Sequence, residues 1–477
     1  MTMRTIVLIF AIGVVGCTKT NPNVCCTDAA DCSSAGIPSV QMCSNGIACL
    51  SHQCIAETCS ASSECTAEAP YCFSGTGLCA GTCSQDIECP GASQSAVDVH
   101  CVGGACVECR ADVATDCSGT APICDSGSCR GCKEHDECAS GACGPDGTCV
   151  DQSLIEYVSK AGASGGDCSY VSPCNNLTLA LSINRAYIVI DAGTYQGNAT
   201  YSLIASRYFI GRGSPIITAT AKGPIFTVQG NVDVHFAHLQ ISGATDTTAG
   251  AHDGDGILCP NSTSGTTIDL DDVSLYSNSG NGMQSRACPI TVRRSRFRSN
   301  VSDGVFCQSN ATVDRSEFSN NGYDGLDFDG AVLKASNVFA FHNAHDGIEY
   351  NSDSAGSAIE FCTTVDNTIY GIAAYQATFG AHTVGISNNL VARNGSAPVD
   401  CGSANPNGCI YGGNIAMMGS DISAFHFKSP DAQPYDYHLA SGSSAIDAAV
   451  TATLDHDFDG DARPKGAGRD VGADEAQ

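Results

Sequence analysis

The segments DGVFCQSNATVDRSEFSNNGY (303–323), DGLDFDGAVLKASNVFAFHNAH (324–345) and DGIEY (346–350) decide the fold. They repeat one pattern about every 22 residues: an opening Asp-Gly with an apolar residue, a second run of alternating apolar and polar residues, and a closing Asn. The opening recurs in Asp255-Gly256-Ile257, Asn281-Gly282-Met283 and Tyr370-Gly371-Ile372, and the closing residues are Asn278, Asn300, Asn321, Asn343 and Asn394. Short strands and Gly or Asn turns at this period predict coils stacked on one another, an all-β parallel β-helix.

Stacking gives equivalent positions a common environment. We expect three inward apolar ladders: Ile257, Met283, Val305, Leu326, Ile348 and Ile372; Leu270, Val292, Val313 and Leu333; and Leu275, Phe297, Phe318 and Val338. The last two ladders come from a second short strand in each copy, expected at Ile268–Leu275, Ile290–Phe297, Ala311–Phe318 and Ala331–Val338. An outward column of alternating charge is expected at Asp271, Arg293, Asp314 and Lys334, and the closing Asn amides should hydrogen-bond from one coil to the next.

The ends of this region resemble known proteins. Tyr157-Val158-Ser159, Gly165-Gly166-Asp167-Cys168, Ser172-Pro173-Cys174, Leu177–Leu181 and the stretch from Tyr187 to Gly193-Thr194-Tyr195 resemble the start of pectin-lyase-like right-handed parallel β-helix proteins. The resemblance implies a short capping helix, a Gly-Thr-Tyr turn and a local Cys168–Cys174 pair, and it does not specify an activity. Four segments near the C-terminus are similar to the choice-of-anchor Q motif that ends β-helix surface proteins: Tyr437-His438-Leu439, Ser443-Ser444-Ala445-Ile446-Asp447, Asp457–Pro464 and Asp470–Glu475.

The N-terminus predicts export. Arg4 precedes an apolar run from Ile6 to Val15, which is too short to cross a bilayer and has the length of a signal-peptide core. Val14-Val15-Gly16-Cys17 resembles a bacterial lipobox, which implies cleavage after Gly16 and a lipid anchor on Cys17; the alternative is an ordinary secretory signal with an incidental cysteine. The residue after the cysteine is Thr18 rather than the Asp that retains lipoproteins in the inner membrane. We therefore expect the protein at the outer membrane or cell surface.

Cysteines define a second region. Of 31 cysteines, 22 lie between Cys25 and Cys149, as five groups of four with Cys25 and Cys54 left as a possible extra pair. The 30 cysteines that remain without Cys17 could all be paired. Few large apolar residues separate them, so these repeats must be held by disulfides. The alternative to disulfides is a zinc site, for which Cys106-Val107-Glu108-Cys109 has a suitable spacing. The predicted organisation is a signal peptide (1–16), a tether (17–24), a disulfide-rich module (25–150), the β-helix (151–440) and a C-terminal cap (441–477).

Candidate functional residues are mainly acidic. Asp327 and Glu349 are expected outward on adjacent coils, where they could act as catalytic carboxylates or, with Asp329 and His345, bind a ligand or Ca²⁺. Asp303, Asp324 and Asp346 are expected to open turns. Arg293 and Arg296, from the basic cluster Arg293, Arg294, Arg296 and Arg298, could bind an acidic glycan or pair with Asp271, Asp314 and Glu317. Asp455, Asp457, Asp459 and Asp461 resemble a calcium loop, the alternative being an acidic strand in which Asp457 pairs with Arg463.

The net charge of the chain narrows the classes of partner that it can bind. A formal net charge of −28 repels phosphate backbones, so we expect no nucleic-acid partner. The leading hypothesis is a non-catalytic surface lipoprotein that binds or adheres to extracellular polysaccharide, with the membrane as its second partner through Cys17. The alternatives are a lyase or hydrolase of acidic polysaccharides and a structural spacer of the envelope. Ca²⁺ is the one cofactor that the sequence suggests.

Overall fold

The computed structural model describes residues 47–50, 53–56, 71–73, 78–80, 83, 85–86, 100–110, 113, 115–261, 265–352, 354–375, 384–396, 399–400, 409–417, 419–450 and 453–476. The expected signal peptide, Cys17 and the tether lie outside these residues. The chain divides into two compact units: the cysteine-rich unit, which ends at Val150, and the β-helix unit, which begins at Asp151 and includes Ser140–Ala142.

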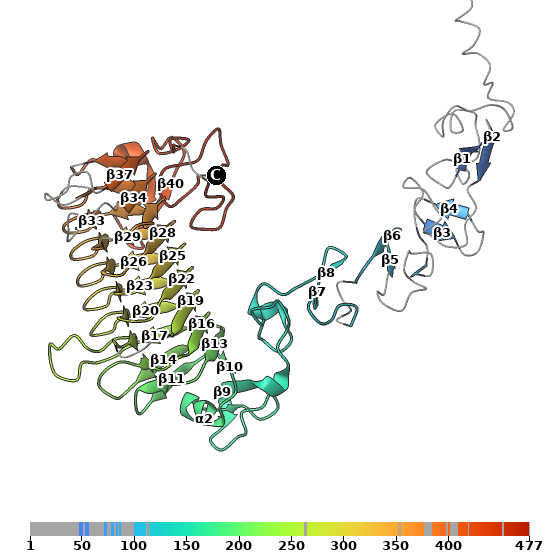
Figure 1. Cartoon of the computed structure of the whole chain (residues 1–477), viewed down its shortest axis with the longest axis horizontal. Coiled ribbons are helices and arrows are strands. Elements are labelled where there is room, and N and C mark those ends of the chain that lie inside the picture. Colours follow the sequence, from blue (N-terminus) through green and yellow to red (C-terminus); the bar gives the residue numbers. More distant parts are fainter. Residues whose placement is uncertain are drawn as a thin grey trace, which may run out of the picture. The chain divides into compact units, whose positions relative to one another are not determined.

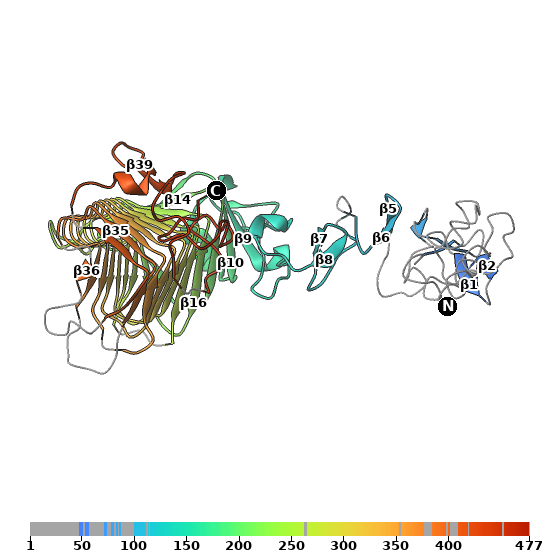
Figure 2. The ribbon, with the colours of Figure 1, turned by 90° about the horizontal axis from the view of Figure 1, so that it is seen from above.

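Three parallel sheets run along the β-helix unit, and nine consecutive coils supply a strand to each (Figure 1). The first sheet contains β9 (Ile155–Ala163), β10 (Tyr187–Asp191), β13 (Arg207–Arg212), β16 (Asp233–Ala237), β19 (Thr267–Asp271), β22 (Ile290–Arg293), β25 (Ala311–Asp314), β28 (Leu333–Ser336), β31 (Ala358–Glu360), β34 (Val384–Ser387) and β37 (Cys409–Gly412). The second contains β11 (Thr194–Gly197), β14 (Ile216–Ala219), β17 (Gln240–Ser242), β20 (Ser274–Tyr276), β23 (Arg296–Arg298), β26 (Glu317–Ser319), β29 (Phe339–Phe341), β32 (Thr363–Val365), β35 (Leu390–Ala392) and β38 (Ile415–Met417). The third contains β12 (Tyr201–Leu203), β15 (Phe226–Val228), β18 (Ile257–Cys259), β21 (Met283–Ser285), β24 (Val305–Cys307), β27 (Leu326–Phe328), β30 (Ile348–Tyr350), β33 (Ile372–Ala374) and β36 (Val399–Asp400). Figure 2, seen from above, shows how closely the coils superimpose.

Residues in left-handed backbone conformation form the corners between the first and second sheets. Each run that we expected to be one strand is two, with Asp272, Arg294, Arg315 or Asn337 at a φ of 52° between them. A residue in this conformation cannot continue a strand, so the chain turns there. The alternation of apolar and polar residues continues on both sides of the turn, which is why the sequence alone suggested one strand.

The predicted register is confirmed over most of its length. Ile257, Met283, Val305, Leu326, Ile348 and Ile372 are paired in order along the third sheet. In the last copy of the other two ladders the prediction was wrong: Val313 pairs with Ala335 rather than Leu333, and Phe318 with Ala340 rather than Val338. Lys334 was expected beside Asp314 but pairs with Thr312. The residue beside Asp314 is Ser336. The prediction is out by two residues, because Leu333 is the inward residue of the neighbouring column, where it pairs with Ala311, and the small Ala335 takes the place beside Val313.

The closing Asn residues form a buried ladder, as predicted. The Nδ2 atom of each donates to the Oδ1 atom of the next at 2.9–3.0 Å through Asn278, Asn300, Asn321, Asn343, Asn367 and Asn394. Asn367, which the sequence analysis did not include, is the fifth member. Each Nδ2 from Asn300 onward also donates to a backbone carbonyl, such as that of Leu275. The ladder therefore satisfies polar groups at a turn that water cannot reach.

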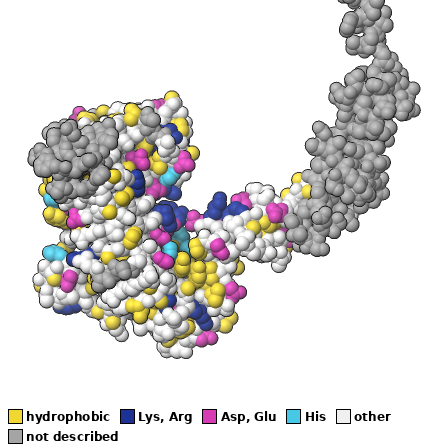
Figure 3. Space-filling view, viewed as in Figure 1, with side chains coloured by type: hydrophobic (Ala, Val, Ile, Leu, Met, Phe, Trp, Pro, Cys, Tyr) yellow, Lys and Arg dark blue, Asp and Glu magenta, His cyan; other side chains and the backbone are white. Residues whose placement is uncertain are grey.

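The β-helix unit is closed at its N-terminal end as the resemblance implied. The helix α2 (Leu177–Ile183) buries Leu177 and Ala180, and Cys168 forms a disulfide with Cys174. Between the sheets the core is a stack of apolar layers, for example the parallel rings of Phe297 and Phe318, with centroids 5.1 Å apart. The surface of the β-helix unit carries side chains of both charges, interspersed with uncharged ones on the face shown in Figure 3.

The C-terminal segment covers part of the second sheet. The 3₁₀ turn η7 (Ser423–Phe425), β39 (Phe427–Ser429) and β40 (Asp436–Leu439) lead into an irregular tail, which the structure describes as far as Ala476. Buried residues of this segment pack on Phe339, Phe341, Val365 and Leu390 from β29, β32 and β35. Arg463, with a fully buried side chain, pairs with Glu475 at 3.1 Å, so the pair expected between Arg463 and Asp457 is wrong. The reason is that the Asp457 carboxylate accepts the backbone N–H groups of Asp461 and Glu475.

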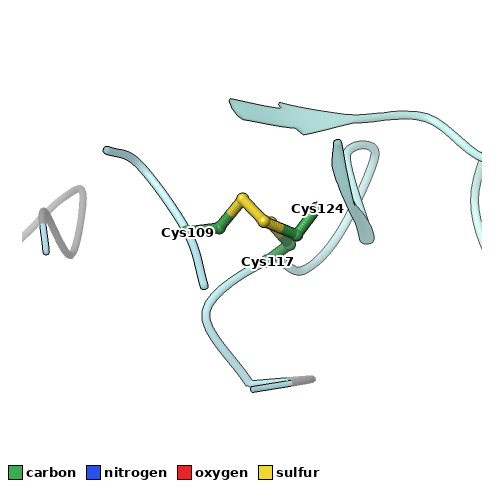
Figure 4. Close-up of side chains that lie close together, drawn as sticks. All are labelled: Cys109, Cys117 and Cys124. Atoms are coloured by element: carbon green, nitrogen blue, oxygen red, sulfur yellow. A yellow bond between two sulfur atoms is a disulfide. The ribbon is translucent and has the colours of Figure 1, made fainter. Parts of the chain in front are cut away.

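The cysteine-rich unit is a series of short hairpins: β1 (Ile47–Leu50) with β2 (Gln53–Ala56), β3 (Tyr71–Phe73) with β4 (Leu78–Ala80), β5 (His100–Val102) with β6 (Ala105–Val107), and β7 (Ile123–Asp125) with β8 (Ser128–Arg130). In the last two groups of four, the first cysteine pairs with the third and the second with the fourth: Cys109–Cys124, Cys117–Cys129, Cys132–Cys143 and Cys138–Cys149. Figure 4 shows the Cys109–Cys124 bond with Cys117 beside it. Since Cys106 is also disulfide-bonded, zinc at this C-x2-C spacing is excluded.

Among the described cysteines, two depart from the expected complete pairing. Cys307 and Cys362 are free thiols buried in the β-helix. Both point into the apolar interior, where a thiol behaves as a small hydrophobic group.

Among the described residues, no helix is long and apolar enough to span a membrane.

Candidate acidic site on the third sheet

The Asp-Gly turns that precede the third sheet form a ladder of their own. The Oδ1 atom of Asp303 accepts the backbone N–H of Asp324 at 2.9 Å, Asp324 Oδ1 accepts that of Asp346 at 2.6 Å, and Asp346 Oδ1 accepts that of Tyr370 at 2.8 Å. The glycine that follows has no room for a side chain: a Cβ atom on Gly325 would lie 2.5 Å from the carbonyl oxygen of Gly347. One oxygen of each carboxylate therefore serves the fold, as the turn role predicted for these aspartates requires.

The second carboxylate oxygen of these aspartates has no such role in the turns. Asp324 is fully buried, and its Oδ2 atom has no hydrogen-bond partner. Asp327 Oδ1 is also buried without a partner. A buried carboxylate oxygen without a donor is costly, so these two atoms call for a proton or a cation.

Asp327 and Glu349 lie side by side, as predicted. They are paired residues at the centres of β27 and β30, and neighbouring strands of a sheet lie about 4.8 Å apart. Candidate ligand atoms of Asp303, Asp324 and Asp327 all lie within 4.8 Å of one another. The same holds for Asp324, His345, Asp346 and Glu349, so Asp324 joins two overlapping groups.

Burial and mutual repulsion raise the pKa of these groups. Burial, together with the nearby carboxylates of Asp303 and Glu349, raises the pKa of Asp327 to about 9. Burial likewise raises the pKa of Asp324 to about 9, that of Glu349 to about 7 and that of Asp303 to about 6. Asp329, in the turn after β27, contributes to the repulsion at Asp327 and Glu349. A divalent cation among these oxygens would replace the protons and remove the repulsion.

Aromatic rings flank the carboxylates. Tyr323 is 49% exposed and stacks on the imidazole of His345, with centroids 4.4 Å apart and an interplanar angle of 6°. His345 Nδ1 lies 2.8 Å from Asp324 Oδ1, which holds the imidazole beneath the tyrosine. Tyr370 and Tyr375 form an edge-to-face pair, and the charge of Asp346 contributes to the raised pKa of both. An exposed aromatic ring beside carboxylates, such as that of Tyr323, suits a sugar ring, which has an apolar face and hydroxyl groups at its edge.

The arginines predicted as ligand contacts lie on other faces of the coil. Arg293, in the first sheet, is 3.7 Å from Asp271 Oδ2, and Arg296, in the second, is 3.7 Å from Glu317 Oε2. These are the ladder pairs that we weighed as the alternative role. The structure does not bring either side chain to Asp327.

The aspartates predicted as a calcium loop separate. Asp455 pairs with His456 and Asp461 with Lys465, while Asp457 is buried against backbone N–H groups. Of these four aspartates, Asp459 is the one that lies close to other potential metal ligands, His438 and Asp474. The chain turns sharply between Asp457 and Asp461, so these four side chains point in different directions and do not surround one point.

Comparisons with known proteins bear on the fold. Residues 228–420 match the family model of the right-handed β-helix region. Among solved structures, pectate lyase Pel9A is 16% identical, with 68% of this chain and 96% of that chain covered and a TM-score of 0.48. The A-module of mannuronan C-5 epimerase AlgE4 from Azotobacter vinelandii is 18% identical, with 45% and 64% covered and a TM-score of 0.34. A rhamnogalacturonan lyase is 13% identical, with 58% and 91% covered and a TM-score of 0.40. No curated protein matches the sequence significantly.

Proposed function

We propose that this protein is an exported, lipid-anchored surface protein whose β-helix binds an acidic polysaccharide through a divalent cation, with Ca²⁺ as the best candidate. The observation that carries the proposal is the pair of buried oxygens without partners, Asp324 Oδ2 and Asp327 Oδ1, within a cluster of carboxylates. Oxygen-only ligands from Asp and Glu are those that Ca²⁺ prefers.

The cation explains how so acidic a surface can hold an acidic ligand. With a net charge of −28, the chain repels a polyuronate at long range. A Ca²⁺ ion bound by Asp303, Asp324, Asp327 and Glu349 would present positive charge to a uronate carboxylate. The exposed ring of Tyr323 would stack on the same sugar or its neighbour.

Binding to immobilised polyuronates and neutral glycans, with Ca²⁺ or with EDTA, tests this proposal. We expect binding to polyuronates in Ca²⁺ only, and its loss in Asp327→Asn and Tyr323→Ala. Asp233→Asn is the matched control, because Asp233 is an exposed outward carboxylate on β16 of another sheet. Equal binding with EDTA, or by Asp327→Asn, would refute the role of the cation.

A second candidate function is polysaccharide hydrolysis by Asp327 and Glu349. It is favoured by their adjacent positions and by the raised pKa of Glu349, about 7, which would let it donate a proton at neutral pH. The reaction also needs an ionised carboxylate, so Asp327, with a pKa of about 9, would have to lose its proton when substrate binds. The release of reducing ends from a panel of acidic polysaccharides would establish it, whereas unsaturated products that absorb in the ultraviolet would indicate a lyase. Binding without either product supports the non-catalytic function.

The surface location has its own test. The lipid anchor is proposed from Val14-Val15-Gly16-Cys17, and the disulfides of the described residues are those of an oxidising compartment. Palmitate labelling of cells should mark the wild-type protein and fail to mark Cys17→Ser. Labelling that survives this substitution would contradict the anchor.

A further inference from the structure

Three potential metal ligands converge in the C-terminal segment, away from the acidic site. His438 lies on β40, Asp459 in the turn between Asp457 and Asp461, and Asp474 near the end of the tail. Candidate ligand atoms of the three lie within 4.8 Å of one another. The three residues come from separate parts of the C-terminal segment, so a shared ligand would tie these parts together.

His438 is oriented as a metal-binding histidine is. Its Nδ1 atom lies 2.5 Å from Asp436 Oδ1, and a proton on Nδ1 donated to this carboxylate leaves the Nε2 lone pair free. The Nε2 atom is buried and forms no hydrogen bond of proper geometry, although Asp459 Oδ2 lies 3.2 Å from it. A carboxylate behind the second ring nitrogen is the usual support of a histidine that binds a metal.

The distances and the burial suit a tetrahedral ion. Ligands at about 2.0–2.1 Å from zinc are separated from each other by roughly 3.3 Å, close to the 3.2 Å between His438 Nε2 and Asp459 Oδ2. Asp474 is 5% exposed and is held in place because its Oδ2 atom accepts the N–H of Leu439 at 2.6 Å. The side chain of Asp459 is 54% exposed, which gives an ion a route from solvent.

We propose that His438, Asp459 and Asp474 form a transition-metal site, with Asp436 as the positioning residue. One imidazole and two carboxylates favour Zn²⁺ over Ca²⁺, which prefers oxygen ligands alone. Three protein ligands leave a fourth position for water or a small anion. His438 also lines a cavity of about 430 Å³ walled by Phe339, Phe341, Tyr435 and Phe458, and the bound ion would lie beside that cavity.

The full chain, purified without a histidine tag and stripped with EDTA, is titrated with Zn²⁺ by calorimetry. The Asp327→Asn background separates this site from the acidic site. We expect one ion per chain, no binding in His438→Gln, and binding weakened about 10- to 100-fold in Asp436→Asn. The control His235→Gln, which removes another histidine paired with an aspartate (His235 Nδ1 to Asp269 Oδ2, 3.0 Å), should bind as the parent does. Co²⁺ should show visible bands without thiolate charge transfer, which excludes cysteine ligands.

The alternative is an imidazolium held between Asp436 and Asp459 with no metal. In that case Zn²⁺ neither binds nor raises the melting temperature, and His438→Gln lowers that temperature equally with Zn²⁺ and with EDTA. Zn²⁺ binding that persists in His438→Gln would also overturn the proposal. If this variant does not fold, Asp459→Asn replaces it, because the half-exposed Asp459 side chain contributes little to the core; unchanged affinity there is equally contradictory.

Discussion

Asp327→Asn should stabilise the cation-free protein and at the same time abolish its stabilisation by Ca²⁺. Burial raises the pKa of Asp327 to about 9 in the folded protein from 3.8, so folding at neutral pH requires this carboxylate to take up a proton. Stability from this group is complete below pH 3.8 and is lost as the pH rises towards 9. At about 1.4 kcal/mol per pKa unit, the penalty at pH 7 is at most about 4 kcal/mol.

Asn carries no charge, so the variant avoids this penalty and keeps only the cost of a buried amide. We therefore expect Asp327→Asn to be more stable than wild type by about 2 kcal/mol in EDTA at pH 7 to 8, and the gain to vanish near pH 4. With Ca²⁺ at 100 times its Kd the order reverses, because wild type gains about 2.7 kcal/mol and the variant gains nothing.

Urea denaturation followed by circular dichroism at pH 4, 7 and 8, with EDTA or Ca²⁺, measures these differences. Asp233→Asn is the control, because its exposed carboxylate should change the free energy of unfolding by less than about 0.5 kcal/mol under every condition. An Asp327→Asn protein that is less stable than wild type in EDTA at pH 8 would refute the reasoning.

Three further predictions concern the fold. Asn343→Ala removes side-chain hydrogen bonds to both neighbours in the Asn ladder, so we expect the free energy of unfolding to fall by about 3–5 kcal/mol, against less than about 0.5 kcal/mol for the exposed Asn198→Ala. Arg463→Met leaves a buried carboxylate without its partner and should cost about 3–5 kcal/mol in urea denaturation; a smaller loss than that of Asn198→Ala would show the pair to be dispensable. Burial raises the pKa of Cys307 and Cys362 to about 12, so mass spectrometry should find both unmodified by iodoacetamide at pH 8 until urea unfolds the chain, and modification of the native protein would contradict their burial.

The sequence predicted the acidic pair because the spacing of the coils hardly changes there. From Val305 to Leu326 to Ile348 each coil repeats the same turn and strand, so the residue after the inward one is outward in every copy. Asp327 and Glu349 follow directly. The same reasoning failed at Lys334, because Leu333 belongs to the neighbouring inward column with Ala311, and the small inward residue that does pair with Val313, Ala335, gives no strong apolar signal in the sequence.

The chemical character of the sites was less accessible from the sequence. The Asp-Gly pattern identified Asp324 as a turn residue, but it could not show that one carboxylate oxygen is consumed by a backbone N–H while the other is buried without a partner. His438, Asp459 and Asp474 are separated by irregular connections without a repeat, so no spacing rule brings them together. Contacts that depend on where a loop folds back, unlike those between stacked coils, require the three-dimensional structure.

The most direct test of the cation site is a calorimetric titration of Ca²⁺ at pH 7 in buffers of different ionisation enthalpy. Because the raised pKa values of Asp324 and Asp327, about 9, keep both carboxylates protonated without the cation, binding must displace protons. We predict one Ca²⁺ per chain with the release of about one to two protons, and no such binding in Asp327→Asn. Ca²⁺ binding without proton release, or binding that Asp327→Asn leaves unchanged, would contradict a cation held by these carboxylates.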